Sequence, residues 1–166
     1  TGGWVHCFTA PRALTLRGGR VIARPYLLGL PLAPATLEGA PGDEAGARVS
    51  ELVGSRSWRL AFDASYEGPL SVRLGEESGL VITLDDGRLT VDLTGTRYPH
   101  GGRRVVTLDA GEARRVEILH DRSITEIYLG DGSRVFTTRS FLKGAGAGVT
   151  LVGDASVTNV SAARAD

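Results

Sequence analysis

The chain has 166 residues, a length that suits one domain with a hydrophobic core of its own. Nineteen Lys and Arg residues balance nineteen Asp and Glu residues, and basic residues cluster only in pairs, so no nucleic-acid partner is predicted. The longest apolar stretch, residues 26–37, is too short to span a bilayer and is interrupted by Pro31 and Pro34, so no membrane partner is expected either.

The first 26 residues predict short strands. Two of them are Trp4 to Phe8 and Ala13 to Leu16, and Gly18-Gly19 then turns the chain into Arg20 to Ala23. A Gly-Gly pair between two apolar runs is typical of a β-hairpin. An isolated hairpin is marginally stable in water, so we expect this one to pack against another part of the protein.

A change of composition marks the next segment, from Tyr26 to Gly46. Pro31, Pro34 and Pro41 occur there among Gly, Ala and Leu residues without a clear period. This pattern predicts a connector that is apolar enough to lie along a surface.

From Arg48 onward, short apolar runs alternate with turn signals about every eight to twelve residues, which is typical of an all-β sandwich. The expected strands are Trp58 to Phe62, Leu70 to Leu74, Leu80 to Leu84, Leu89 to Leu93, Val105 to Leu108, Arg115 to Leu119, Val149 to Val152 and Ser156 to Val160. No long amphipathic helix is predicted. The fold class is therefore all-β, with two antiparallel sheets packed face to face.

The strongest hairpin signal lies between Ile118 and Phe141. Asp131-Gly132 stands between two β-branched and aromatic runs and predicts a type I′ turn. With a two-residue loop, Glu126 lies opposite Thr137 and diagonal to Arg139. Both faces of this hairpin carry apolar residues, so we expect it inside the sandwich.

No catalytic, cofactor-binding or metal-binding residue is predicted. The three histidines, His6, His100 and His120, share no ligand spacing. Asp121 and Glu126 are five positions apart, so on a continuous strand they would point to opposite faces. We therefore predict a structural role for Glu126, paired within the sheet with Arg139 or Arg122.

Aromatic side chains that stack on sugar rings are the candidate ligand contacts. Trp58 alternates with polar neighbours as a core residue does, so its packing role is the stronger interpretation. Tyr66, near Gly68-Pro69, and Tyr98, beside Pro99, are predicted on loops and are the better candidates for contact with a carbohydrate.

Two stretches of the chain resemble glycoside hydrolase family 32, the group of invertases, levanases and sucrose-6-phosphate hydrolases. The residues Asp121-Arg122-Ser123, Glu126, Gly132 and Thr138-Arg139 are similar to a hairpin in the C-terminal β-sandwich of that family. The residues Gly3-Trp4, Thr9, Pro11-Arg12, Leu14, Leu16 and Arg24-Pro25 resemble the segment that closes the last blade of its five-bladed catalytic propeller.

This resemblance implies a division of the chain. Residues 1–26 would be a remnant of the last propeller blade, residues 27–47 a linker, and residues 48–166 a sandwich of jelly-roll-like topology. The family's catalytic carboxylates lie in Asn-Asp-Pro, Arg-Asp-Pro and Glu-Cys stretches of the propeller. None is present here, because no Asp precedes any of the seven prolines and Cys7 follows His6. The chain also lacks methionine, so we expect a piece of a longer protein.

Three functional hypotheses follow. The first is a non-catalytic module of a bacterial enzyme that hydrolyses β-D-fructofuranosyl bonds in sucrose, sucrose-6-phosphate or fructans. The module would brace the propeller of the same parent chain and aid oligomerisation. The second is a free-standing carbohydrate-binding sandwich that uses Tyr66, Tyr98 or Trp58. The third is a structural piece whose exposed strand edges pair with a second copy.

Overall fold

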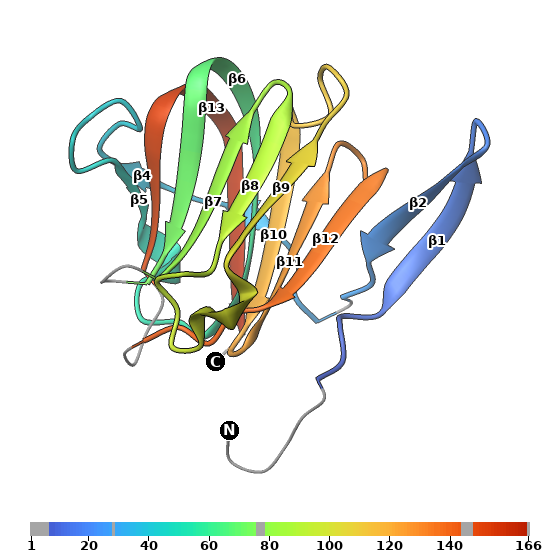
Figure 1. Ribbon diagram of the computed structural model, residues 1–166, viewed down its shortest axis with the longest axis horizontal. Helices are drawn as coiled ribbons and strands as arrows, with labels where there is room; N and C mark the ends of the chain where they lie inside the picture. Colours follow the sequence, from blue (N-terminus) through green and yellow to red (C-terminus); the bar gives the residue numbers. More distant parts are fainter. Residues whose placement is uncertain (1–6, 28, 76–78, 144–147, 166) are drawn as a thin grey trace.

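The computed structural model describes residues 7–27, 29–75, 79–143 and 148–165 (Figure 1). In these ranges no helix has the length and apolar character needed to cross a membrane. The strands are β1 Arg12–Arg17, β2 Arg20–Pro25, β3 Ala33–Pro34, β4 Leu37–Glu38, β5 Ala47–Val49, β6 Ser57–Leu74, β7 Leu80–Asp85, β8 Arg88–Asp92, β9 Arg103–Thr107, β10 Arg115–Asp121, β11 Ile124–Leu129, β12 Arg134–Arg139 and β13 Val149–Ala165. Two 3₁₀ helices, η1 Ser50–Leu52 and η2 Pro99–Gly101, complete the described elements.

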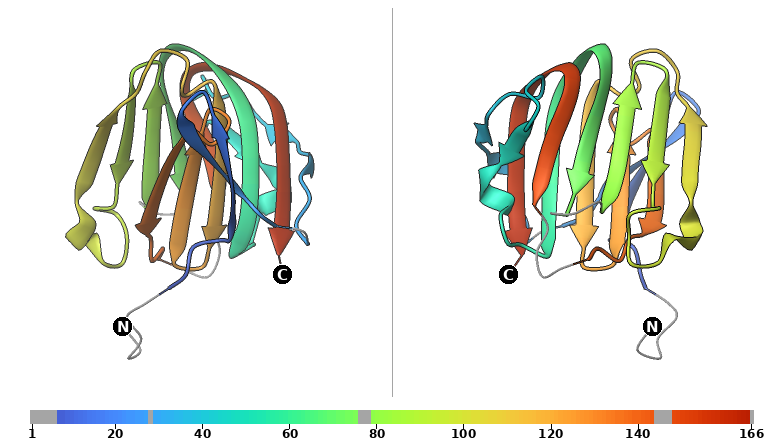
Figure 2. Two further views of the ribbon diagram at one scale, coloured as in Figure 1. Left: turned by 90° about the vertical axis from the view of Figure 1, so that its right-hand side faces the viewer. Right: turned by 60° about the vertical axis from the view of Figure 1, so that its left-hand side comes forward.

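The two long strands, β6 and β13, pair with each other and run through both layers of a sandwich (Figures 1 and 2). In the first layer, the first half of β6 pairs with β10, and β11 and β12 follow. In the second layer, the second half of β6 pairs with β7, and β8 and β9 follow. The fold class predicted from the sequence, an all-β sandwich of antiparallel sheets, is confirmed.

The long strands cross between the layers at a bulge rather than a break. The register of β13 against β6 shifts between Gly153 and Ala155. Gly153 has φ of 138°, and a Cβ there would lie 2.0 Å from the carbonyl oxygen of Pro69. The sequence had predicted two strands in place of each long one. That prediction was wrong because a bulge bends a strand without ending it.

The core lies between the two layers. Trp58, Leu60 and Phe62 alternate inward along the first half of β6, as predicted, and each is fully buried. They pack with apolar side chains from both layers, among them Leu70, Val72, Leu74, Ile82, Leu84, Val116, Ile118 and Ile127. These side chains fix which face of the first layer points outward.

The β11–β12 hairpin has the predicted register, with Glu126 opposite Thr137. Its turn differs from the prediction. Positive φ occurs at Gly130 (63°) and Gly132 (97°), whereas Asp131 is not among the described residues with positive φ. The predicted type I′ turn is therefore wrong. The register is unaffected, because it depends on the number of residues between the strands.

A second tight turn precedes this hairpin. Arg122 and Ser123 alone connect β10 to β11, because Asp121 pairs with Ile124. The chain reverses there, so Asp121 and Glu126 do not share one continuous strand. Both point to the outer face of the first layer, which corrects the expectation of opposite faces.

The predicted N-terminal hairpin is present as β1 and β2, with Gly18-Gly19 at its turn, and it lies against the outer face of the first layer (Figure 2). Of the strand expected over Trp4 to Phe8, residues 4–6 lie outside the described residues, and so do Gly3 and Trp4 of the N-terminal motif. Cys7 and Phe8 have irregular structure.

Candidate functional site

The junction between the β1–β2 hairpin and the sandwich is formed by a group of buried polar contacts. Leu119, Ile124, Glu126 and Tyr128 all lie on the outer face of the first layer, where solvent would normally reach them. They are nevertheless buried, with exposed fractions of 7%, 7%, 0% and 3%. The N-terminal segment that contacts Glu126 and Tyr128 covers this face.

Glu126 is the centre of the junction. Its carboxylate accepts hydrogen bonds from the backbone N–H of Ala10 (2.7 Å) and from the hydroxyl of Tyr128 (2.9 Å), and it forms an ion pair with the guanidinium of Arg12. A buried carboxylate needs such partners, because removing it from water without them is costly. We call Ala10, Arg12, Glu126 and Tyr128 the clasp.

Arg12 joins the clasp to both strands beneath it. Its Nε donates to the Tyr128 hydroxyl (3.2 Å), and an Nη donates to Oγ1 of Thr137 on β12 (2.9 Å). The predicted partners of Glu126, Arg139 and Arg122, are wrong. The partner is Arg12, which precedes Glu126 by 114 residues. Nothing local in the sequence signals so distant a pair.

The clasp shifts the pKa values of Arg12 and Tyr128. Burial raises the pKa of Tyr128 to about 12, and its hydrogen bond to Glu126 adds to that effect. Burial alone would lower the pKa of Arg12, but its hydrogen bonds to Glu126 and Tyr128 outweigh that effect and raise it. Arg12 therefore stays charged and Tyr128 stays neutral at physiological pH.

A second contact fastens the hairpin to the β11–β12 turn. The N–H of Ala23 donates to the carbonyl of Gly132 (2.9 Å), and Nε of Arg24 donates to the carbonyl of Asp131 (2.9 Å). A Cβ at Gly132 would lie 2.3 Å from the carbonyl oxygen of Ala23, so glycine is needed for this close approach.

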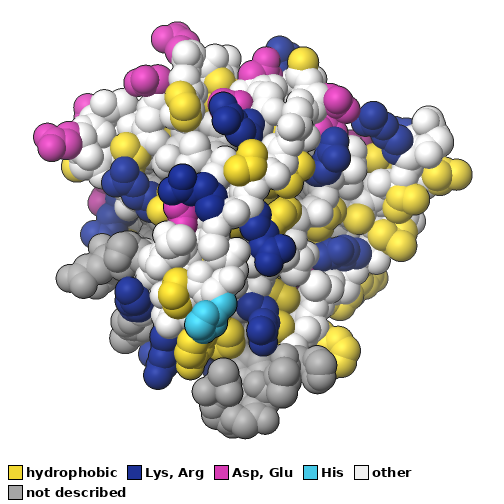
Figure 3. Space-filling view, viewed as in Figure 1, with side chains coloured by type: hydrophobic (Ala, Val, Ile, Leu, Met, Phe, Trp, Pro, Cys, Tyr) yellow, Lys and Arg dark blue, Asp and Glu magenta, His cyan; other side chains and the backbone are white. Residues whose placement is uncertain are grey.

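The other face of the hairpin has no cover within the described residues. Ile22 points toward the sandwich and is 4% exposed, whereas Leu14, Leu16 and Val21, on the opposite face, are 66%, 76% and 59% exposed. Figure 3 shows apolar side chains gathered at its right-hand side, where β1 and β2 lie in the same view in Figure 1. Apolar patches of this kind are typical of surfaces that contact another sheet or molecule.

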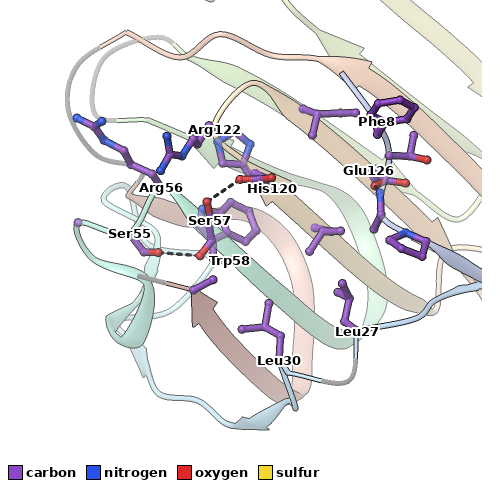
Figure 4. Close-up of a pocket in the computed structure, with 18 residues that line it drawn as sticks. Phe8, Leu27, Leu30, Ser55, Arg56, Ser57, Trp58, His120, Arg122 and Glu126 are labelled. Atoms are coloured by element: carbon purple, nitrogen blue, oxygen red, sulfur yellow. Dashed lines mark hydrogen bonds between the residues drawn. The ribbon is translucent and has the colours of Figure 1, made fainter. Parts of the chain in front are cut away.

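A groove of about 750 Å³ opens beside the clasp (Figure 4). Residues 8–11, Leu27 and Leu30 form one side, and the β10–β11 turn with the loop of residues 54–57 forms the other. Arg56 and Arg122 lie together at one end, and Phe8 and Glu126 lie at the opposite end. Trp58 and His120 lie between the two ends.

His120 is held neutral in the wall of this groove. It is 2% exposed, its ring lies 5.4 Å from that of Trp58, and its Nδ1 is 2.9 Å from Oγ1 of Thr125. Burial lowers the pKa of His120 to about 4, although the nearby charge of Asp121 opposes the shift. The imidazole thus serves at neutral pH as an uncharged hydrogen-bonding ring.

The three candidate sugar contacts have different surroundings. Trp58 is 0% exposed as a residue, although part of it lines the groove. Tyr66 donates its hydroxyl to the carbonyl of Ala113 (2.8 Å), and Tyr98 packs edge-on against Phe141 with ring centres 5.1 Å apart. Among them, only Trp58 lines the groove. In the described ranges no three His, Cys, Asp or Glu side chains cluster as metal ligands would.

Residues 44–165 match the family model described as "Glycosyl hydrolases family 32 C terminal". A sucrose-6-phosphate hydrolase of Pediococcus pentosaceus is 28% identical over 158 residues, which are 91% of this chain and 31% of that protein. A sucrose-6-phosphate hydrolase of Klebsiella pneumoniae is 31% identical over 143 residues, 84% of this chain and 27% of that protein. The chain thus spans about a third of the length of these relatives.

Solved structures show the same fold. The sucrose-6-phosphate hydrolase of Lactobacillus gasseri superimposes with a TM-score of 0.77 at 20% identity, over 98% of this chain and 34% of that one. A β-fructofuranosidase of Bombyx mori superimposes with a TM-score of 0.69 at 21% identity, over 94% of this chain and 32% of that one.

Proposed function

Because the chain belongs to glycoside hydrolase family 32, and matches that family's C-terminal domain over residues 44–165, we propose that it is a non-catalytic module of an enzyme that hydrolyses β-D-fructofuranosyl bonds. The substrate would be sucrose, sucrose-6-phosphate or a fructan. The names of the two relatives described above, both sucrose-6-phosphate hydrolases, support this choice of substrates. Within the enzyme, residues 1–26 would belong with the catalytic domain and 48–166 would form the sandwich. Residues 27–47 would link the two, and their short strands β3, β4 and the start of β5 also add to the sheet of β13.

The observation that carries this proposal is the docked hairpin. The clasp binds the start of β1 to the sandwich, and the face of β1–β2 that carries Ile22 is turned toward it. The opposite face presents Leu14, Leu16 and Val21 to solvent. A two-stranded sheet with an exposed apolar face gains stability when another sheet covers that face. The hairpin would thereby transmit the rigidity of the sandwich to the catalytic domain.

The carboxylates of the sandwich support a structural role. Retaining glycosidases use two carboxyl groups about 5 to 5.5 Å apart, one of them free to attack the substrate. Glu126 is fully buried and already accepts three hydrogen bonds, from Ala10, Arg12 and Tyr128. The motifs that carry the family's catalytic carboxylates do not occur in the chain.

The test compares the purified chain with the same chain joined to its catalytic domain. We expect sucrose and sucrose-6-phosphate hydrolysis only from the joined protein. Leu14→Lys combined with Leu16→Lys should lower the melting temperature of the joined protein, whereas Val105→Lys, at a 58% exposed position on β9, should not. Hydrolysis by the chain alone, or equal melting temperatures in both variants, would contradict the proposal.

Oligomerisation through the same hairpin face is a further element of this proposal. A second copy that covers Leu14, Leu16 and Val21 would give a dimer in the isolated chain. Sedimentation of the isolated chain tests it. A monomer at all concentrations would contradict oligomerisation through the hairpin and would not affect the proposed bracing role.

Binding of a neutral carbohydrate is the second candidate function, because Trp58 lines the groove beside the clasp. Titration with sucrose, inulin and levan oligosaccharides tests it by calorimetry. A heat of binding that is lost in the Trp58→Phe variant would support this function. Tyr66→Phe and Tyr98→Phe serve as comparison variants. Absence of heat with all three ligands would remove it.

A further inference from the structure

The β1–β2 hairpin carries charge of one sign only. Four arginines and no acidic residue occur in residues 12–25. The ion pairs that they form with the sandwich are Arg12 with Glu126, Arg17 and Arg24 with Asp131, and Arg20 with Asp109. Opposite charge therefore draws the hairpin onto the sandwich.

Apolar contact adds little to this docking. Ile22 is the only buried residue of β1 and β2, and Leu14, Leu16 and Val21 face away from the sandwich. Burial of apolar surface usually supplies most of the stabilisation between packed elements. Because so little apolar surface is buried here, the docked position of the hairpin depends on its polar contacts.

One zone of polar contact lies at the base of the hairpin, where the clasp holds it. The side chain of Glu126 is 1% exposed and that of Arg12 is 26% exposed. The N–H of Tyr26 donates to the carbonyl of Pro11 (2.7 Å) and closes the hairpin at the same end. Salt screens a buried ion pair much less than an exposed one, so the base stays bound as the ionic strength rises.

A second zone runs from Ala23 to the tip of the hairpin and contains exposed ion pairs. An Nη of Arg17 lies 2.7 Å from the carboxylate of Asp131, and an Nη of Arg20 lies 3.5 Å from that of Asp109. Figure 3 shows basic side chains next to acidic ones at its upper right, beside the tip of the hairpin. Exposed pairs of this kind contribute little and weaken in salt. We call this set the latch; its members are Arg17, Arg20, Arg24, Asp109 and Asp131.

Asp131 is the centre of the latch. Its Oδ2 lies 2.7 Å from an Nη of Arg17 on β1 and 3.9 Å from an Nη of Arg24 on β2. Arg17 is also the cross-strand partner of Arg20, and like charges directly opposite each other destabilise a strand pair. Loss or screening of the Asp131 charge would therefore remove two attractions and leave the arginines to repel one another.

We propose that the latch is a conformational device that responds to ionic strength. The clasp keeps the base of the hairpin fixed. The part from Ala23 to the tip moves off the sandwich when the exposed pairs are screened and returns when they form again. In a protein joined to its catalytic domain, the hairpin would pivot about the clasp and tilt the face of Leu14, Leu16 and Val21. The tilt of the catalytic domain that follows rests on the proposed function, whereas the latch itself does not.

Hydrogen exchange of the 166-residue chain tests the latch, because one amide reports on each zone. The N–H of Ala10 is bonded to Glu126 in the clasp, and that of Ala23 is bonded to the carbonyl of Gly132, the residue after Asp131. NaCl is raised from about 0.01 M to about 1 M, which shortens the screening length from about 30 Å to about 3 Å. We expect exchange at Ala23, relative to the unfolded chain, to rise about fivefold, and exchange at Ala10 to change less than about twofold.

Two variants separate the latch from charge in general. Asp131→Asn keeps the size of the side chain and removes its charge, so exchange at Ala23 should rise about fivefold in low salt and respond less to added NaCl. Asp85→Asn is the control, because Asp85 forms an ion pair with Arg88 (3.6 Å) in the second layer, and it should leave exchange at Ala23 unchanged. Exchange at Ala23 that is independent of salt, equal acceleration at Ala10 and Ala23, or equal effects of the two variants would overturn the proposal. Neither substrate nor the catalytic domain is present, so failure of the latch and failure of the proposed function are distinguishable.

Discussion

At the scale of single residues, the clasp shows how a carboxylate can be buried when partners from a distant part of the chain surround it. Glu126 lies on strand β11, whose residues are all buried. Its carboxylate is paired with Ala10 and Arg12 of the N-terminal segment and with Tyr128 on the same strand. A buried ion pair contributes modestly when intact and is costly when one partner is removed. Its main effect is to specify one docking position for the hairpin.

Arg12→Gln should release the hairpin from the sandwich. The change leaves the Glu126 carboxylate without its counter-charge, so we expect the docked state to lose about 3 kcal/mol. Hydrogen exchange measures this directly, because the amides of Ala10 and Ala23 are protected only by contacts across the junction.

Arg17→Gln is the matched control, since Arg17 forms an exposed ion pair with Asp131 on the same hairpin. An exposed pair contributes up to about 1 kcal/mol, so exchange at Ala10 should hardly change. Equal exchange in the two variants would show that the clasp does not hold the hairpin.

His120 should make the stability of the chain depend on pH. Its pKa is lowered from 6.5 to about 4 by burial, so the unfolded chain binds more protons than the folded one between these values. The stabilisation is complete above pH 6.5 and is lost as the pH falls toward 4, by about 3 kcal/mol at most. Urea unfolding at pH 7 and pH 4.5 measures it, and His120→Phe should remove most of this slope. A slope that persists in that variant would assign it to other groups.

At the scale of elements, the bulge at Gly153 decides whether β6 and β13 can pass from one layer to the other. Gly153→Ala places a Cβ 2.0 Å from the Pro69 carbonyl at a φ of 138°, and we expect a loss of about 3 kcal/mol in the free energy of unfolding. Gly42→Ala is the control, because nothing lies within 4 Å of its added Cβ. Similar denaturation midpoints for the two variants would show that the bulge tolerates a side chain.

The elements also show what the sequence can predict. Alternation at Trp58, Leu60 and Phe62 and the loop length of the β11–β12 hairpin predicted the inner face and the register, because both depend on residues close in the chain. The continuity of β6 and β13 was missed, since Gly68-Pro69 looks like a chain break and becomes a bend only when the facing strand bulges. The partner of Glu126 was missed because 114 residues separate it from Arg12.

At the scale of the whole molecule, the two layers share their central strands. Ser57 pairs with Ala165 in the first layer and Leu74 pairs with Val149 in the second, within one pair of strands. Neither layer can unfold while the other keeps its centre. We therefore expect one unfolding transition for the sandwich, with coincident denaturation curves from Trp58 fluorescence in the Trp4→Phe chain and from circular dichroism. Curves that separate would show that the layers unfold independently.

The same pair of strands bears on synthesis at the ribosome. β6 is made well before β13, yet β13 is its neighbour in both layers, so one edge of β6 stays unpaired until β13 has been synthesised. A nascent chain that has been synthesised through β12 can form its hairpins, but its core is not yet closed. Contacts between such distant segments form slowly, and the waiting strand edge is open to wrong pairing. A chain that terminates before β13 would lack the strand that completes both sheets.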